Sequence, residues 1–374
     1  MSEKCFNIEF SDIKLCVAKK KIKYINVGEI LMKRLMYVDW LRVLATIAVV
    51  TIHVSAGYVA VLDANNVSRW MAGNLFESIS RASVPIFVMI SGALLLKGTK
   101  DISVGEFLQK RASKVIIPFV AWSAIFYAYG AYAGYFPASL KQGIKHFLTD
   151  TIGGHLWFLY MIVGIYLITP LLKIFVKNAK KREIEYFLIL WLYASVIVNL
   201  VKYYYPINFN IELFYVTNYV GYFLLGYYLS NFDISKKWRS ISYIGGLVGF
   251  ISTFFITYYY TVKANGQLEQ FWYGYFAPGV VLMAIGLFVF FKYAFQKSER
   301  ELPLLFRFIN QASLGIYILH FFLLNNLLYM VFPKVNERVH AILAIPINVT
   351  ITIVLSLIIT LVLQRIPVVK KLVP

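Results

Sequence analysis

Cysteine is almost absent from this chain of 374 residues, which contains only Cys5 and Cys16. A disulfide framework or a thiolate metal site is therefore not expected. No group of His, Cys, Asp and Glu residues has the spacing of metal ligands either, so no metal is predicted. The first thirty residues lack the compact apolar core and small-residue cleavage site of a secretory signal. We also find no tandem repeat and no domain-sized soluble segment.

Charged residues are scarce as well, at 15% of the chain, whereas 60% of the residues are hydrophobic. This composition is typical of integral membrane proteins rather than soluble ones. The sequence predicts an all-α fold, a polytopic membrane helix bundle with about ten transmembrane helices. The apolar runs that would form them lie near residues 41–62, 82–97, 115–135, 155–176, 184–201, 214–230, 241–262, 271–292, 311–332 and 341–363.

Acidic residues are half as common as basic ones, with 18 Asp and Glu against 37 Lys and Arg. Most basic residues fall before the first apolar run and in alternate loops, which predicts that both termini are cytoplasmic. Residues 1–34 are then a cytoplasmic basic tail, and residues 35–374 form one membrane-embedded domain. The formal charge of +19 is interpreted as a topology signal and a means of contacting anionic membrane lipids, not as evidence for nucleic-acid binding.

His53 is an ionisable residue near the middle of the first apolar run. At about 1.5 Å per helical residue it lies about 16 Å beyond Arg42, roughly half the hydrocarbon thickness. Eleven residues make about three turns, so Arg42 and His53 share one helix face, and Asp39 lies near it. Polar groups at this depth suggest function. The alternatives are an interfacial anchor at Arg42 and a packed histidine at position 53.

A second basic pair precedes the third apolar run. Arg111 and Lys114 are three residues apart, so a short helix would present both on one side. Together with Arg42 they would suit a ligand that carries several phosphates. The alternative is the ordinary positive charge of a cytoplasmic loop.

Five further side chains are candidates to line a pocket or contact an acceptor: Arg81, Ser91, His155, Trp157 and His320. Arg81 is assigned to an external loop. His320 reaches a depth similar to that of His53, and either completes a polar pocket with it or bonds a backbone carbonyl. His155 and Trp157 are placed where the fourth run meets the outer face, where a Trp either belongs to the aromatic belt or stacks on a sugar.

Several of these motifs resemble a known family. The sequence Asp-Trp-Leu-Arg at 39–42, with His53 eleven residues after Arg42, is similar to the first span of the acyltransferase-3 family of integral-membrane O-acyltransferases. Residues 84–92 resemble its second span, and residues 111–118 its basic motif before the third. Further matches lie at 155–159, 221–226 and 314–320. The similarity looks strongest to the subgroup that acetylates surface polysaccharides, such as the enterobacterial common antigen O-acetyltransferase.

The resemblance implies transfer of an acyl group, usually acetyl, from cytoplasmic acyl-CoA to a hydroxyl of an extracytoplasmic or lipid-linked glycan. Acetyl-CoA would be a substrate and not a bound cofactor, and the site of action would be a bacterial cell membrane. His53 would be the catalytic base or the acyl-accepting residue, and Arg42 would position the donor. Arg111 matches the first Arg of an Arg-x-x-Arg motif. Its second position is Lys114 here, which keeps the charge but lacks the bidentate fork.

Two other classes of protein would also fit a chain of about ten spans. A transporter or flippase of lipid-linked sugars more often shows halves related as repeats, together with discontinuous mid-membrane helices. We find no such symmetry in the sequence. A structural or sensory membrane protein would have no need of the aligned Asp39, Arg42 and His53.

Overall fold

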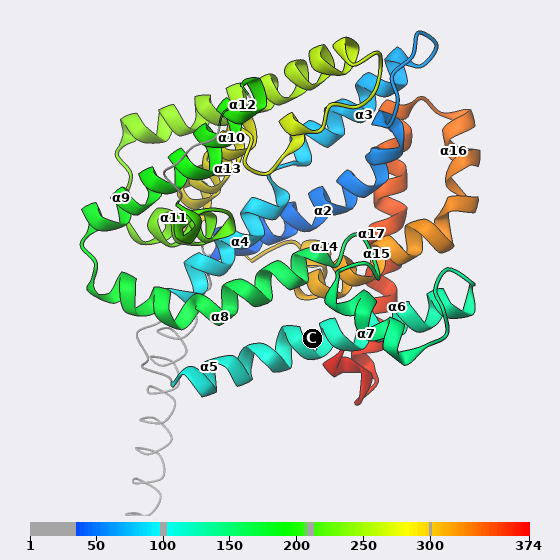
Figure 1. The fold of residues 1–374 in the computed structure, drawn as a ribbon, viewed down its shortest axis with the longest axis horizontal. Coiled ribbons are helices and arrows are strands. Elements are labelled where there is room, and N and C mark those ends of the chain that lie inside the picture. The colour runs from blue at the N-terminus through cyan, green and yellow to red at the C-terminus, as the bar shows by residue number, and fades with distance from the viewer. Residues whose placement is uncertain (1–34, 98–102, 206, 208–212, 299–300) are drawn as a thin grey trace, which may run out of the picture. The chain divides into compact units, whose positions relative to one another are not determined.

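Figure 1 shows a computed structural model of the protein. Its described residues are 35–97, 103–205, 207, 213–298 and 301–374. The chain divides into two units, Met1–Met36 and Tyr37–Pro374, and the second contains every site discussed below. The predicted basic tail, residues 1–34, and both cysteines lie outside the described residues, so the predicted boundary after residue 34 stays a prediction.

Helices make up the secondary structure of the described residues, apart from one isolated bridge between Val61 and Gln267. The α-helices are α2 (Met36–Val59), α3 (Val67–Ser80), α4 (Ser83–Leu95), α5 (Val104–Arg111), α6 (Ile117–Tyr132), α7 (Leu140–Leu148), α8 (Trp157–Asn178), α9 (Lys181–Leu192), α10 (Val198–Tyr204), α11 (Tyr219–Asn231), α12 (Lys236–Lys263), α13 (Pro278–Phe295), α14 (Leu304–Gln311), α15 (Ser313–Asn326), α16 (Phe332–Arg338) and α17 (Ala341–Arg365). Two π-helical turns, η1 (Ala112–Ile116) and η2 (Tyr193–Ile197), and four short 3-10 helices, Phe214–Val216, Phe271–Tyr273, Leu328–Met330 and Val369–Lys371, complete the set.

Within the described ranges, eight helical segments are long and apolar enough to cross a membrane, and α14 with α15 would make a ninth if this pair, bent by 80°, is one span. The predicted fold class, a polytopic bundle of membrane helices, is confirmed. The predicted run at 214–230 falls on α11, which has 13 residues. A span needs about 20 residues. The count of ten therefore stays a prediction.

The second span is longer than the sequence suggested. Helices α3 and α4 together form a segment of 29 residues from Val67 to Leu95 that meets the criteria for a span. Arg81 lies between these two helices, within this segment. Its assignment to an external loop was therefore wrong.

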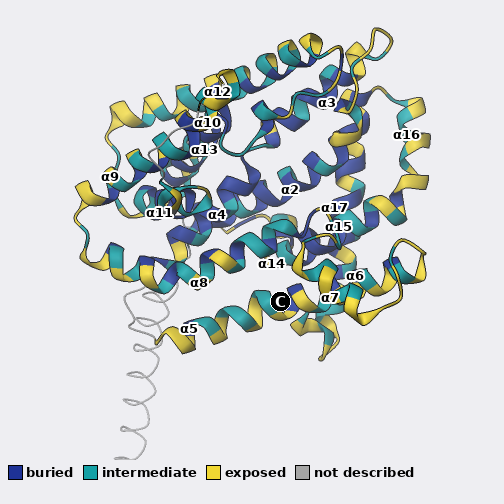
Figure 2. Cartoon of the chain, in the orientation of Figure 1, coloured by how far each residue is buried: buried dark blue, intermediate teal, exposed yellow. Residues whose placement is uncertain are grey.

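Exposed apolar side chains follow single faces of the peripheral helices. On α8 this face carries Leu167, Leu171 and Ile174, and on α12 it includes Ile244 and Ile251. Helix α2 is buried over most of its length (Figure 2). Apolar faces of this extent are unfavourable in water and are expected to contact lipid tails.

Glycines allow close contact between α4 and α11. A Cβ atom built on Gly92 would lie 1.8 Å from the carbonyl oxygen of Phe223, and one built on Gly226 would lie 2.0 Å from that of Met89. The two backbones are therefore in direct contact, as small residues allow between membrane helices. This packing fixes α4, which carries Ser91, beside the site described next.

Candidate active site

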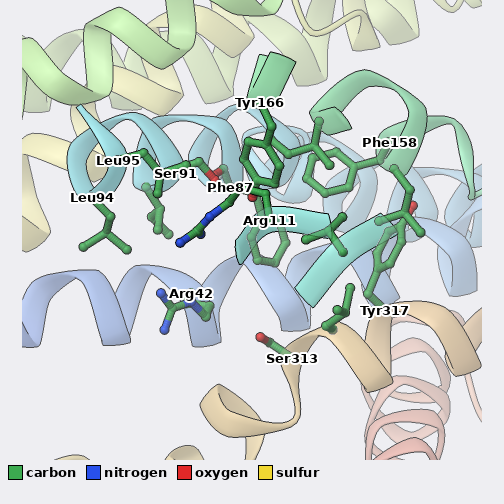
Figure 3. A pocket seen from close by; sticks show the side chains of 15 residues that line it. Arg42, Phe87, Ser91, Leu94, Leu95, Arg111, Phe158, Tyr166, Ser313 and Tyr317 are labelled. Atoms are coloured by element: carbon green, nitrogen blue, oxygen red, sulfur yellow. The ribbon is translucent and has the colours of Figure 1, made fainter. Parts of the chain in front are cut away.

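A cavity of about 240 Å³ brings together residues from five segments of the chain (Figure 3). Two of its lining residues, Arg42 on α2 and Arg111 at the end of α5, are cationic. We call this space the arginine cavity. Its other polar lining residues are Ser91, Tyr166, Ser313 and Tyr317. The structure thus places three predicted site residues, Arg42, Ser91 and Arg111, around one space.

A hydrogen-bonded group behind the cavity holds Arg42. Its Nη1 donates to Oδ1 of Asn310 at 2.9 Å and lies 3.4 Å from Oδ1 of Asp39. Asn310 in turn donates from Nδ2 to the Asp39 carboxylate at 2.8 Å. Both partners are buried. Asp39 therefore orients the guanidinium of Arg42 and does not line the cavity, because charge-assisted hydrogen bonds of this kind fix geometry.

The bend between α14 and α15 explains how Asn310 reaches Arg42. Asn310 lies near the end of α14, and Ser313 begins α15 after the 80° change of direction. The break turns Asn310 toward α2 and Ser313 into the arginine cavity. Neither residue was predicted from the sequence to belong to the site.

Arg111 and Lys114 do not face the same way. Arg111 lines the cavity, its guanidinium carbon lies 6.0 Å from the ring centre of Tyr166, and its buried Nε has no hydrogen-bond partner. Lys114 is exposed and is not part of the cavity lining. The π-helical turn η1 begins directly after Arg111 and changes the number of residues per turn, so residues three apart no longer share a face. The expectation that both cations lie on one side was wrong.

Three histidine rings gather next to this cavity. The ring centre of His53 lies 5.0 Å from that of His320, which lies 5.7 Å from that of His155. Phe321 contacts both outer members of the group, at 5.2 Å from His53 and 4.7 Å from His155. We call His53, His155 and His320 the histidine cluster. His155 is only 2% exposed and lies directly before α8, so its ring is packed inside the protein at the start of the fourth predicted span.

The main chain assigns the hydrogens of two of these rings. His320 Nδ1 lies 3.1 Å from the carbonyl oxygen of Ile316, and His155 Nε2 lies 3.2 Å from that of Ile318. A carbonyl only accepts, so these nitrogens donate, and the opposite nitrogen of each neutral ring can accept a proton. Those opposite nitrogens are buried and have no partner. His53 makes no hydrogen bond to another described residue.

Tyr317 connects the arginine cavity to the histidine cluster. Its side chain lines the cavity, and its hydroxyl donates to the backbone carbonyl of His155. Its ring centre lies 5.8 Å from those of both His155 and His320. Helix α2 also runs from the arginine cavity to the histidine cluster, with Arg42 at the cavity and His53 at the cluster. The helix face predicted to carry both Arg42 and His53 therefore joins the arginine cavity to the histidine cluster.

A family model described as an acyltransferase domain matches residues 35–363, which include α2 to α16 and nearly all of α17. The chain belongs to the acyltransferase-3 family. No curated protein and no solved structure matches it. Together with the apolar helices, the match makes this protein a multi-pass membrane acyltransferase.

Two further candidates, Arg81 and Trp157, contact tyrosines of the segment 273–275. Arg81 of the acyltransferase forms an ion pair with Glu77, and its guanidinium carbon lies 4.3 Å from the ring centre of Tyr273. Trp157 stacks on Tyr275 with ring centres 5.6 Å apart. Although three histidines gather nearby, no group of three or more His, Cys, Asp or Glu side chains in the described part of the chain is placed to hold a metal ion.

Proposed function

We propose that this acyltransferase moves an acyl group, acetyl in the first instance, from cytoplasmic acyl-CoA to a hydroxyl of an extracytoplasmic or lipid-linked glycan. The observation that supports this most directly is the position of Arg42 and Arg111 around one cavity that adjoins the histidine cluster. Two guanidinium groups suit the phosphates of coenzyme A, and an imidazole suits the proton transfer that follows. We place the protein in a bacterial inner membrane and in the subgroup that acetylates surface polysaccharides.

The reaction exchanges a thioester for an ester. The acceptor hydroxyl attacks the thioester carbonyl, its proton passes to a base, and the coenzyme A thiolate leaves and takes up a proton. His53 would be that base. In the alternative route His53 first accepts the acyl group on a ring nitrogen and then passes it to the acceptor. Only the second route releases coenzyme A in the absence of acceptor, in an amount equal to the enzyme present.

The arginine cavity would enclose only part of the donor. Its volume of about 240 Å³ is below the roughly 300–1,000 Å³ of sites that bury a drug-sized ligand. We assign the phosphates to Arg42 and Arg111, whose side chains both point into this space (Figure 3). The thioester end would then lie toward Tyr317, which contacts the histidine cluster.

Membranes that contain the protein are expected to transfer label from acetyl-CoA, radiolabelled in its acetyl group, to an alkali-labile position on glycan. Membranes that lack the protein, and membranes that carry the Arg42→Ala/Arg111→Ala variant, are the controls. In the source cell, deletion of the gene should remove O-acetyl signals from surface polysaccharide. Acyl-independent movement of lipid-linked sugar across the bilayer, with no transfer of label, would support the transporter alternative instead.

The predicted topology is tested by single cysteines placed in a variant in which Cys5 and Cys16 are replaced by Ser. Lys114 near α5 and Lys141 on α7 are both exposed, so a thiol reagent in the surrounding water can reach either position. A membrane-impermeant reagent should label Lys141→Cys in intact cells and Lys114→Cys only after permeabilisation, because positive charge marks the cytoplasmic side. The reverse pattern would place the arginine cavity on the wrong side for coenzyme A and contradict transfer from a cytoplasmic donor to an extracytoplasmic acceptor.

A further inference from the structure

A buried ion pair lies within the span formed by α3 and α4. Glu77 is 0% exposed, and Arg81 binds it across one helical turn. Oε1 of Glu77 and Nε of Arg81 are buried and have no hydrogen-bond partner. Charges removed from water are stabilised only when good geometry and further hydrogen bonds compensate for lost hydration. This pair therefore retains hydrogen-bonding capacity that another polar molecule can use.

A cavity of about 370 Å³ opens beside the pair, and we call it the Glu77–Arg81 cavity. Gln270, Tyr273 and Tyr275 supply its other polar lining residues. Tyr273 is held in place by its hydroxyl, which donates to Oδ1 of Asn74 at 2.5 Å. Its ring lies beneath the guanidinium of Arg81. Glu77, Arg81 and Tyr273 thus form a part of the wall in which each side chain has a fixed partner.

Helix α2 connects this cavity to His53. Ala56 on α2, and Ala60 directly after the end of this helix, line the cavity. Ala56 follows His53 by three residues, the spacing of neighbours on one helix face. Their small side chains leave open the space that larger residues would fill. Three residues advance a helix by about 4.5 Å. A molecule seated in this cavity would therefore lie about one helical turn from the position of His53, on the side away from Arg42.

We propose that the Glu77–Arg81 cavity is the acceptor subsite and that it takes an uncharged sugar ring. This proposal rests on the proposed function, since only an acyl acceptor needs to approach His53 opposite the donor. Sugar hydroxyls both donate and accept, so one ring can donate to the Glu77 carboxylate and accept from the Arg81 guanidinium. Tyr275, backed by the ring of Trp157, offers an aromatic surface to the sugar.

The charges of the pair set the specificity of the subsite. Glu77 and Arg81 neutralise each other, so the cavity has no net charge from this pair to balance a charged ring. A uronic acid would bring a second carboxylate close to Glu77 in a region of low dielectric constant, where repulsion between like charges is strong. The ammonium group of an amino sugar would be repelled by the Arg81 guanidinium in the same way. The arrangement favours neutral hexoses and N-acetylated hexosamines.

Protection of an engineered cysteine tests binding without acyl transfer. Ala60→Cys is introduced into the variant in which Cys5 and Cys16 are Ser, and the protein is placed in phospholipid nanodiscs. Its rate of thiol labelling is measured with methyl glycosides of glucose, galactose, mannose and N-acetylglucosamine, and with the methyl glycosides of glucuronic and galacturonic acid. At least one neutral glycoside should slow labelling, whereas both uronides should leave it unchanged. Lys141→Cys, on α7, is the control for effects on the reagent.

Glu77→Gln keeps the size of the side chain and removes its charge. It should raise the concentration of neutral glycoside that halves the rate of cysteine labelling by about tenfold or more. This is the effect of losing one charge-assisted hydrogen bond. Unchanged labelling of Ala60→Cys without sugar shows that the cavity is still formed. If Glu77→Gln fails to insert, Gln270→Ala is measured instead, because Gln270 is an exposed lining residue whose loss should weaken protection without affecting the fold.

Three results would each overturn the subsite. No neutral glycoside protects the cysteine, a uronide protects it equally well or better, or protection by the neutral glycoside stays complete after Glu77→Gln or Gln270→Ala. None of these readouts requires acyl-CoA. Sugar protection without acetyl transfer would therefore reject the proposed function and leave a site that binds sugar but is not an acyl-acceptor subsite. Acetyl transfer without protection would reject the subsite alone.

Discussion

His53→Ala is expected to abolish acyl transfer in a protein that is still correctly inserted. A positioned acid–base group contributes about 100- to 10,000-fold to the rate, and an acyl-accepting residue is required outright. The substitution removes the ring contacts of His53 with His320 and Phe321 but no hydrogen bond to another described residue. It should therefore affect the fold little. The measurement is the initial rate of transfer of labelled acetyl from acetyl-CoA to glycan, at equal amounts of inserted protein.

His146→Ala provides the matched control for removal of a histidine. His146 lies on α7, where its half-buried ring hydrogen-bonds the hydroxyl of Thr151 at 2.7 Å, and we assign it no role in the reaction. Its loss should change the rate by about twofold at most, as for most surface substitutions. A near-parental rate in correctly inserted His53→Ala would contradict the assignment. The unpartnered Nε2 of His320 would then be the next candidate for the base.

The fold class was predictable because apolar runs determine membrane helices. Each backbone polar group must be satisfied within the segment in lipid, so a long apolar run leaves few alternatives to a helix. The prediction was wrong where polar residues interrupt the run. Helix α3 contains Asn74 and Glu77, and their partners Tyr273 and Arg81 were not recognisable as partners from hydropathy. The second span was therefore predicted to begin near residue 82 and not at Val67.

Local periodicity located part of the site, and tertiary packing determined the rest. Arg42 and His53 lie on one helix, so their common face follows from helix geometry alone. Asn310 contacts Arg42 only because the chain bends between α14 and α15. His155 lies in the turn before α8, where its ring packs against α15 and bonds the carbonyl of Ile318. No spacing in the sequence specifies these contacts.

The Glu77–Arg81 pair did have a sequence signal. Opposite charges four residues apart are neighbours on a helix face, and this pair directly precedes the apolar residues of α4. Recognition of that spacing would have extended the second span and placed Arg81 inside it. Which cavity the pair lines could not follow from spacing, because Gln270 and Tyr275 come from a segment almost two hundred residues away.

Arg111→Ala is expected to weaken use of the acyl-CoA donor far more than Lys114→Ala. The two residues belong to the same predicted motif and carry the same charge, but only Arg111 lines the arginine cavity, whereas Lys114 is exposed. A charge-assisted hydrogen bond contributes about 1.5–3 kcal/mol, so its loss should raise the KM for acetyl-CoA about 10- to 150-fold. A surface cation should change this KM by about twofold at most. Steady-state kinetics with varied acetyl-CoA at fixed acceptor provide the measurement.

Arg111→Lys separates the charge from the geometry of the guanidinium. Lysine keeps the positive charge but lacks the planar fork that binds phosphate through two parallel hydrogen bonds. If Arg111 contacts phosphate as proposed, this variant should give a KM between those of the parent and Arg111→Ala, while the KM for the acceptor stays the same. Equal effects of Arg111→Ala and Lys114→Ala would instead indicate long-range attraction by the whole loop. An unchanged donor KM in Arg111→Ala would reduce the motif to a topology signal, and the donor phosphates would then have to bind elsewhere than in the arginine cavity.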